Sequence, residues 1–480
     1  MLFNSLEYLI FLPLVFIVYW LLNKNLKLQN NFLFVASYVF YGWWDWRFLG
    51  LLMLSTIIDY SFGFLVDTPN ERRRKMFMWL SVFNNLIVLC VFKYYNFFVL
   101  ETQQFMANFG INFSPYVLKV VLPVGISFYT FHGMSYVLDI YRGKSKPVKS
   151  FVDYSLFVSF FPLLVAGPIE RAWHLLPQIQ RKRKFDYNQA RDGIGLMVYG
   201  FFKKIVISDT IAETVNSIFA TANEQTSLSL VIGAVLFSFQ IYADFSGYSD
   251  IALGTSKLLG FELLSNFKFP YFSRNIAEFW RRWHISLSSW FRDYVYIPLG
   301  GSKGSKFKSI RNVMIIFLLS GFWHGANMTY IVWGLIHGLL FLPIFLLNNN
   351  RKKLDEVVAT GRTFPTIKEL LQIAITFSTV TIAWIFFRSP TIDVAISYIG
   401  NMFTKPFTTQ GMSLLTFQAL LYPPVLLFFD WLNRYNERQL AIFNYKHKWL
   451  RTVLYVFFVI LIFSHINLLT TQKDFIYFQF

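Results

Sequence analysis

The sequence predicts an all-α polytopic membrane protein, and three observations support that prediction. The chain has 480 residues, of which 55% are hydrophobic and 15% are charged, whereas a soluble protein carries roughly a quarter charged residues. Apolar runs of about 15 to 25 residues recur from end to end, and this length crosses a bilayer as a helix. Lys and Arg stand in short segments between these runs, so the net charge of +18 indicates membrane topology and not a nucleic-acid partner.

Cys90 is the only cysteine, and it lies inside an apolar run. A single cysteine excludes a disulfide within the chain and a cysteine-based metal site. The N-terminal residues lack a basic segment and a small-residue cleavage site. We therefore expect the first apolar run to be a retained span and not a signal peptide.

The first three apolar runs cover about residues 7–22, 31–46 and 48–66. Basic residues follow the first run, at Lys24 and Lys27, and the third run, at residues 71–75. We expect both loops in the cytoplasm and the N-terminus outside. The tryptophans within residues 43–46 fit either an interfacial belt or buried aromatic packing.

The next two apolar runs cover about residues 76–100 and 115–141. The second is either one irregular span or two pieces, because three helix breakers interrupt it: Pro123, Gly125 and Gly133. His132 lies among them, and a structural, hydrogen-bonded role is favoured over a catalytic one.

Residues 151–169 form an apolar run with basic segments on both sides, at 142–149 and 171–184. Both flanks are expected in the cytoplasm, and Pro162 and the Gly167–Pro168 pair break the helix. We therefore expect a re-entrant element that lines a cavity open to the cytoplasm, since irregular backbone at membrane depth needs cover from protein or water.

Two further spans are expected at about 193–208 and 228–258, with an acidic outer loop between them that contains Asp209, Glu213 and Glu224. The second span contains Asp244 and Asp250. Six residues correspond to about 600° of helical rotation, so we expect these carboxylates to face opposite sides. A paired acid–base dyad is not expected, and binding and structural roles both stay open.

The C-terminal part contains expected spans near 367–388, 414–432 and 452–470, and an amphipathic segment near 391–404. No internal repeat is visible. We expect one integral-membrane domain over residues 1–480, with about eleven to twelve transmembrane helices. Its predicted parts are peripheral helices (1–100), a catalytic core (about 115–340) and C-terminal helices (365–480).

Residues 278–294 have the periodicity of one amphipathic helix. Its aromatic face contains Trp280, Trp283, His284, Leu287, Trp290, Phe291 and Tyr294. Charged residues on the other side exclude a span, so we expect an interfacial or cavity-lining helix with its arginines toward water or lipid phosphate. His284 is the one titratable group on the aromatic face, and by itself it is more typical of a core histidine satisfied by a neighbour.

His324 lies about twelve residues into the apolar run that begins at Asn312, roughly 18 Å along a helix. Ionisable groups at such depth are costly and are commonly functional. A neutral imidazole there is suited to general-base work on a hydroxyl, although a buried hydrogen-bonded histidine is the alternative. His337 faces another direction, and we expect a structural role. The basic loop 300–311 is typical of the cytoplasmic side, and contact with an anionic cofactor is an alternative role.

Several motifs carry a family resemblance: FWRRWHISLSSWFRDYVYIPLGG, SGFWHGANMTYIVWGLIHG, LPVGISFYTFHGMSYVLDIYRG, LVAGPIER, DFSGYSDIALG, WIFFRS and FIYFQF. With these motifs the sequence resembles the membrane-bound O-acyltransferase family over essentially its whole length. It is most similar to the branch of bacterial alginate O-acetyltransferases and related cell-wall acyltransferases.

The resemblance implies a ring of tilted helices in which a funnel from one side meets a tunnel from the other. It implies that His324 is the active-site histidine and that His284 is the second histidine of the site. The expected substrate or donor tunnel residues are Trp280, Trp283, Arg281, Arg282, Trp323, Asn327, Ser320, Asp244 and Ser246. No role is carried over to His132.

The resemblance also implies an activity. Acetyl-CoA, or another acetyl thioester, is the expected cytoplasmic donor, and no metal is expected. The expected acceptor is a surface polysaccharide, either an alginate-like exopolysaccharide or peptidoglycan. The expected partners are membrane lipids and an extracytoplasmic esterase-like acetyltransferase, and the expected location is the bacterial inner membrane.

Three alternatives stay open at the level of the sequence. A lipid O-acyltransferase and a protein O-acyltransferase would use the same histidines. A transporter would explain the buried aspartates and broken helices, but it predicts inverted repeats, which are not visible.

Overall fold

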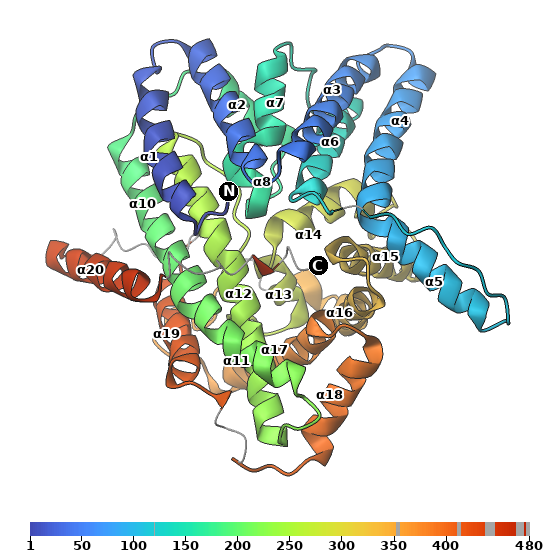
Figure 1. The fold of residues 1–480 in the computed structure, drawn as a ribbon, viewed down its shortest axis with the longest axis vertical. Helices are drawn as coiled ribbons and strands as arrows, with labels where there is room; N and C mark the ends of the chain where they lie inside the picture. The colour runs from blue at the N-terminus through green and yellow to red at the C-terminus, as the bar shows by residue number, and fades with distance from the viewer. Residues whose placement is uncertain (120, 352–355, 410–413, 437–446, 467–474, 477–480) are drawn as a thin grey trace. The chain divides into compact units, whose positions relative to one another are not determined.

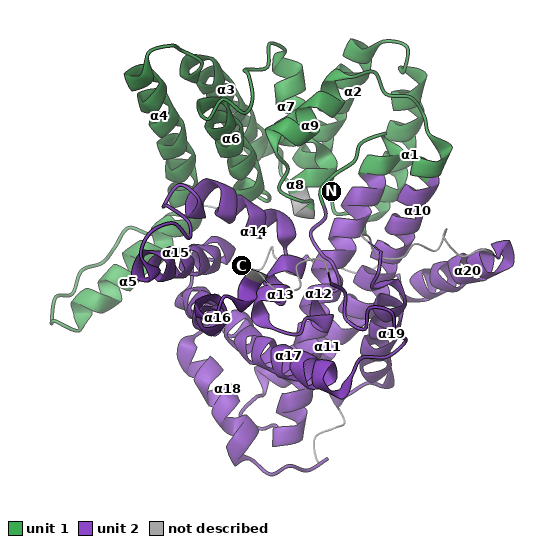
Figure 2. Cartoon of the chain, turned by 180° about the vertical axis from the view of Figure 1, so that it is seen from behind, with its two compact units in different colours: residues 1–190, 256–264 green, residues 191–255, 265–480 purple. Residues whose placement is uncertain are grey.

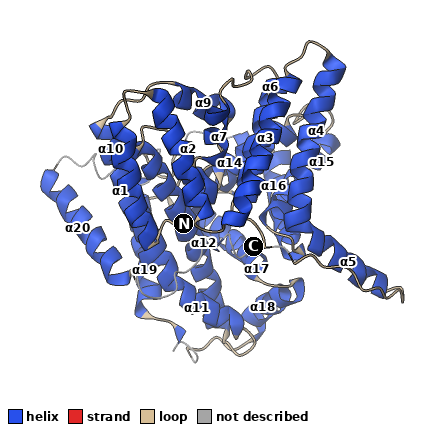
Figure 3. Cartoon of the chain, turned by 45° about the horizontal axis from the view of Figure 1, so that its top comes forward, coloured by secondary structure: helices blue, strands red, loops and turns tan. Residues whose placement is uncertain are grey.

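The computed structural model describes residues 1–480 except 120, 352–355, 410–413, 437–446, 467–474 and 477–480 (Figure 1). The described residues form helices joined by loops and contain no β-strand, which confirms the all-α prediction (Figure 3). The chain forms two compact units (Figure 2). Unit 1 contains residues 1–190 and 256–264, and unit 2 contains residues 191–255 and 265–480. The expected single domain and its three parts stay a prediction.

Unit 1 contains the first nine α-helices, the 3₁₀-helix η1 and the π-helix η2. These are α1 (Leu6–Leu21), α2 (Leu26–Gly42), η1 (Trp46–Phe48), α3 (Leu49–Val66), α4 (Glu71–Leu89), η2 (Cys90–Tyr94), α5 (Tyr95–Ala107), α6 (Ile126–Tyr141), α7 (Phe151–Ser159), α8 (Phe161–Ala166) and α9 (Ala172–Gln180). The π-helix η2 joins α4 and α5 into one helix of 37 residues.

The helices that follow belong mainly to unit 2. They are α10 (Tyr187–Phe201), η3 (Phe202–Ser208), α11 (Asp209–Ala220), α12 (Ser227–Leu258), η4 (Pro270–Phe272), α13 (Ile276–Arg282), α14 (Ile285–Phe291), η5 (Arg292–Tyr296), α15 (Lys306–His324), α16 (Met328–Leu346), η6 (Asn349–Arg351), α17 (Ile367–Arg388), α18 (Ile392–Thr404), α19 (Phe417–Asn433) and α20 (Lys448–His465). Both η3 and η5 are π-helices.

Six helical segments of the described chain are long and apolar enough to cross a membrane: Trp46–Val66, Glu71–Ala107, Ser227–Leu258, Met328–Leu346, Ile367–Arg388 and Lys448–His465. The protein is therefore a multi-pass membrane protein. The expected total of eleven to twelve spans stays a prediction, because the other apolar helices are shorter.

The predicted acidic loop after residue 208 is wrong at its beginning. The helix continues without interruption from α10 through η3 to the end of α11 at Ala220, so Asp209 and Glu213 are helical. The physical reason is local pairing, since the Asp209 carboxylate lies 2.8 Å from the Lys204 ammonium across the π turn. An aspartate that is paired with a lysine in this way can be part of a helix and does not require an exposed loop.

Two irregular regions of unit 1 follow the predicted breakers only in part. Gly125 has a φ of 74° and precedes α6, so the described part of residues 115–125 is not helical. Gly133 does not break α6. It lies against the Asp59 side chain, and an added Cβ would overlap that carboxylate. Residues 151–169 form two short helices that break at Phe160, which agrees with an irregular element.

Two glycines let α15 and α16 pack closely in unit 2. A Cβ at Gly321 would overlap the Tyr330 carbonyl oxygen, and a Cβ at Gly334 would overlap the Phe317 carbonyl oxygen. Helices that approach through glycine bring their backbones together. This contact fixes the end of α15, where His324 is the last residue.

Candidate active site

His284 lies at a sharp break between α13 and α14. Arg282 ends α13, Trp283 has an extended backbone, and His284 has a φ of 42° and a ψ of 54°. The single helix predicted over residues 278–294 is therefore wrong. A non-glycine residue at positive φ is strained by about 1–3 kcal/mol and persists only where its surroundings hold it.

Asn266 holds this break from a distant part of the chain. Its carbonyl oxygen accepts the Ile285 N–H at 2.9 Å, and its side-chain oxygen accepts the Ser286 hydroxyl at 2.6 Å. Its side-chain nitrogen donates to the Ser249 hydroxyl at 3.1 Å. A further backbone bond joins the Lys268 N–H to the Arg282 carbonyl at 2.9 Å. These bonds replace those that a continuous helix would make.

The His284 imidazole is fully buried among aromatic rings. Its centroid lies 4.7 Å from that of Phe245 and 5.6 Å from that of Trp323. Neither ring nitrogen has a hydrogen-bond partner among the described residues. Burial lowers the pKa of His284 to about 3, so the imidazole is neutral at neutral pH and has unused hydrogen-bonding capacity.

His324 meets His284 from the end of α15. The two ring centroids lie 6.3 Å apart, and His324 is 3% exposed. Three other aromatic rings contact His324 at centroid distances of 5.0 to 5.2 Å: Trp323, Trp333 and Phe387. The two histidines therefore lie close together, as a single shared site requires. They do so because the helix breaks at His284 and its imidazole is buried.

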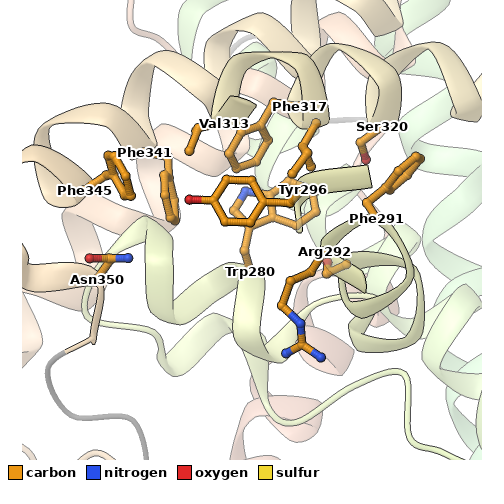
Figure 4. Close-up of a pocket in the computed structure, with 12 residues that line it drawn as sticks. Trp280, Phe291, Arg292, Tyr296, Val313, Phe317, Ser320, Phe341, Phe345 and Asn350 are labelled. Atoms are coloured by element: carbon orange, nitrogen blue, oxygen red, sulfur yellow. The ribbon is translucent and has the colours of Figure 1, made fainter. Parts of the chain in front are cut away.

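A cavity of about 220 Å³ lies along α15, and neither histidine is among its lining residues (Figure 4). Its lining is mainly aromatic and aliphatic and consists of Trp280, Ser288, Phe291, Arg292, Tyr296, Val313, Ile316, Phe317, Ser320, Phe341, Phe345 and Asn350. Ser320 is one helical turn before His324 on the same face. The cavity therefore extends along α15 to within a turn of the buried histidine.

The predicted tunnel residues Trp280 and Ser320 line the cavity, whereas Trp283 and Trp323 do not. Trp283 is fully buried, stacks on Phe279 at 5.5 Å and contacts Trp384 at 5.0 Å. Trp323 contacts both histidine rings, at centroid distances of 5.6 Å from His284 and 5.1 Å from His324.

The prediction that the arginines of residues 278–294 point to water or lipid is wrong in part. Arg282 is 8% exposed and lies 2.9 Å from the Glu278 carboxylate, which also receives Arg274. Arg281 donates to the Asn350 carbonyl at 2.8 Å. Arg292 agrees with the prediction, since it is mostly exposed and pairs with Asp293. The buried arginines therefore brace α13.

Asp244 and Asp250 face one neighbouring element, so the prediction that they face opposite sides is wrong. Asp244 lies 2.7 Å from the Lys204 ammonium, and Asp250 lies 2.7 Å from that of Lys203. Both lysines belong to the π-helix η3, in which an extra residue per turn alters the usual spacing of side chains. The two carboxylates form ion pairs and do not face the cavity.

The remaining predicted residues do not line the cavity either. Asp244 also accepts the Ile476 N–H at 2.7 Å, and Ser246 is fully buried with no hydrogen-bond partner for its hydroxyl among the described residues. Asn327 caps α16 through the Thr329 N–H and donates to the Pro390 carbonyl. His337 accepts the Trp280 indole N–H at 3.3 Å, which agrees with the structural role expected of it.

Sequence reasoning missed four residues that shape the site: Asn266, Phe245, Trp333 and Phe387. Trp333 and Phe387 lie in quoted motifs but received no role. Asn266 precedes the aromatic-rich residues 267–272, and a polar residue in that position is a weak signal. Nothing local in the sequence pairs it with Ile285, nineteen positions later.

The fold and this geometry define a helical, multi-pass membrane protein with a buried two-histidine site beside an apolar cavity. A family model described as MBOAT, membrane-bound O-acyltransferase family, matches residues 79–347. The chain belongs to the membrane-bound O-acyltransferase family, and it is an O-acyltransferase.

Three curated relatives extend this similarity beyond the matched core. A probable alginate O-acetylase, AlgI, of Pseudomonas aeruginosa is 40% identical over 408 residues, which are 84% of this chain and 75% of the relative. The protein of the same name from Azotobacter vinelandii is 37% identical over 444 residues, 92% of this chain and 85% of the relative. A peptidoglycan O-acetyltransferase of Helicobacter pylori is 33% identical over 435 residues, 84% of this chain and 80% of the relative.

Proposed function

We propose that this chain takes acetyl groups from a cytoplasmic thioester and passes them across the membrane for O-acetylation of a cell-surface polysaccharide. The observation that carries the proposal is the convergence of two buried imidazoles, 6.3 Å apart, one helical turn beyond Ser320, which lines an apolar cavity. The names of the relatives support a polysaccharide acceptor, either an alginate-like exopolysaccharide or peptidoglycan.

The cavity fits the reactive end of an acetyl thioester. Its apolar walls suit an aliphatic arm, and polar groups at Ser288, Tyr296 and Asn350 can bond the amides of such an arm. Arg292 lines the same cavity and is mostly exposed, so it can meet an anionic donor such as acetyl-CoA. Ser320 lines the cavity and lies one helical turn before His324 on the same face of α15.

In the proposed reaction His324 is the general base. The acceptor hydroxyl oxygen attacks the thioester carbonyl carbon, a C–O bond forms, and the C–S bond breaks. His324 takes the hydroxyl proton and returns it to the leaving thiolate, so the transfer needs no other reactant. An imidazole can both accept and return a proton in this way.

His284 is proposed to contact the reacting groups directly. A neutral imidazole has one N–H donor, and this group in His284 has no partner in the described protein. It can therefore donate to the oxygen that becomes negatively charged as the hydroxyl attacks. A preorganised donor of this kind contributes about 10²- to 10³-fold to rate.

The proposal includes a location and a partner. We place the protein in the bacterial inner membrane with its N-terminus outside, because the basic loops near residues 24–27 and 71–75 favour the cytoplasm. An extracytoplasmic esterase-like acetyltransferase is proposed to carry the acetyl group onward, alongside membrane lipids as the immediate surroundings.

Substitution of His324 tests the proposed function. The variant His324→Ala should lower acetylation of surface glycans by about 10²- to 10⁴-fold, which is the usual contribution of a general base. Mass spectrometry of glycans from producing cells measures this, with protein amount in the membrane fraction as the reference. His174→Gln, a change at a partly exposed histidine of unit 1, is the matched control. Full activity of His324→Ala would refute the proposed role.

A further inference from the structure

The His324 imidazole packs against a wall of buried aromatic rings. Trp333 and Phe387 contact the imidazole edge-on, at centroid distances of 5.0 and 5.2 Å, and lie 5.3 Å from each other. Trp384 supports both, stacked on Trp333 at 5.5 Å and 5.1 Å from Phe387. The three side chains are at most 1% exposed. Trp384 and Phe387 belong to the WIFFRS segment, which has no part in the mechanism above.

The direction from which a thioester donor approaches His324 decides which part of the donor meets these rings. The cavity reaches Ser320 between α14, η5, α15 and the C-terminal half of α16, whereas Trp333 lies in the N-terminal half of α16 and Phe387 in α17. A thioester that lies in the cavity with its carbonyl at His324 has its sulfur arm behind and its acyl chain ahead. The chain therefore points toward the rings that contact His324.

We infer that Phe387, seated against Trp333, limits the transferred acyl group to two carbons and is a specificity-determining residue of this enzyme. The inference rests on the proposed role of His324. Protein interiors are close-packed, and a rigid aromatic ring cannot yield to an added methylene without displacing its neighbours. One methylene too many in an apolar pocket lowers the rate by about 10- to 200-fold.

The experiment compares acyl donors in membranes of producing cells, which retain the acceptor. Thiol release from acetyl-CoA, propionyl-CoA and butyryl-CoA is measured, and the rate with His324→Ala membranes is subtracted. The wild-type protein should prefer acetyl-CoA over butyryl-CoA by at least about 100-fold. Phe387→Ala and the milder Phe387→Leu should raise the butyryl-to-acetyl ratio by at least about tenfold, because each creates space beside His324.

Phe377→Ala is the matched control, because it removes a ring from the same helix. Phe377 packs on Phe239 and Tyr271 and lies ten positions before Phe387, roughly 15 Å along α17. This variant should leave the donor ratio within about twofold of wild type.

The outcomes separate the two proposals. If His324→Ala membranes release thiol as fast as wild type, the proposed catalytic role fails. If release depends on His324 but wild type uses butyryl-CoA as well as acetyl-CoA, the length limit alone fails. It also fails if either Phe387 variant keeps the wild-type ratio, or if both are folded yet inactive with every donor.

Discussion

His132 in unit 1 and His284 in unit 2 are both fully buried and both lie among aromatic side chains. His132 lies within the regular helix α6, and its Nε2 accepts the Glu170 N–H at 3.0 Å. His284 lies between two helices at positive φ, and neither of its nitrogens has a partner among the described residues.

This comparison shows that burial alone does not mark a functional histidine. Most buried polar groups in proteins are hydrogen-bonded, so an imidazole with unused capacity in a strained segment needs an explanation. His132 uses one of its two ring nitrogens on the backbone of the GPIER segment and so stabilises unit 1. His284 keeps its capacity for a group that the protein chain itself does not supply.

The largest expected difference comes from removing each imidazole. His284→Asn, chosen because Asn tolerates positive φ, should lower acyl transfer by about 10²- to 10³-fold with little change in thermal stability. His132→Ala should leave activity per folded molecule unchanged. It should destabilise the protein by about 1–3 kcal/mol, because the Glu170 N–H loses its acceptor. Transfer assays and thermal unfolding in detergent measure the two effects. Equal loss of activity in both variants would erase the distinction.

A smaller effect is expected from the residue that holds the break. Asn266→Ala removes the bonds to Ser249 and Ser286, and it should lower activity by about tenfold to a hundredfold because small displacements of a reacting group are costly. Asn85→Ala in unit 1 is the control, since Asn85 is equally buried and bonds Asp59. Both variants should lose about 1–3 kcal/mol of stability. Similar activity in the two variants would show that the break needs no such support.

The smallest expected effect concerns pH and unit 1. The hydrogen bond that His174 Nδ1 donates to the Glu170 carboxylate, 2.7 Å away, raises the pKa of the partly buried His174 above its usual value. The folded state therefore binds this proton more tightly than the unfolded state. The resulting stabilisation, about 1 kcal/mol or less, is complete below the unfolded pKa of about 6.5 and is lost as pH rises through the folded pKa.

Thermal unfolding of wild type and His174→Gln between pH 5 and 9 measures this contribution. The difference between the two proteins should shrink as the pH rises. A difference that grows with pH would reverse the sign of the linkage and rule out the protonated pair.

The sequence was sufficient for the helical class and for a multi-pass membrane protein, because apolar run length is a local signal, whereas the roles of His284 and His324 stay predictions. The span at 228–258 corresponds closely to α12 (Ser227–Leu258), and the run at 367–388 to α17. Helical periodicity over residues 278–294 failed because the break at His284 depends on Asn266, which is distant in the chain. The pattern of apolar positions carries no information about the hydrogen bonds that Asn266 makes.

The aspartates failed for a different physical reason. The calculation from helical rotation considers one helix alone and assumes that the neighbouring helix is a regular α-helix. About 600° leaves Asp244 and Asp250 roughly 120° apart on α12, and the π-helix η3 then presents consecutive lysines to both. The irregular helix was not visible in the sequence, since its residues are apolar or basic like those around it.

Because η3 contains a π turn, the stability of this segment depends more on how many residues it has than on which apolar residues they are. Deleting one residue between Phe202 and Ser208 would restore the regular α-helical pitch and rotate one flank by about 100°. Lys203 or Lys204 would then stay buried while its carboxylate partner faced elsewhere, and an unpaired buried charge destabilises a protein by about 3–5 kcal/mol. Over evolutionary time, apolar replacements here can drift, whereas single-codon deletions should be eliminated.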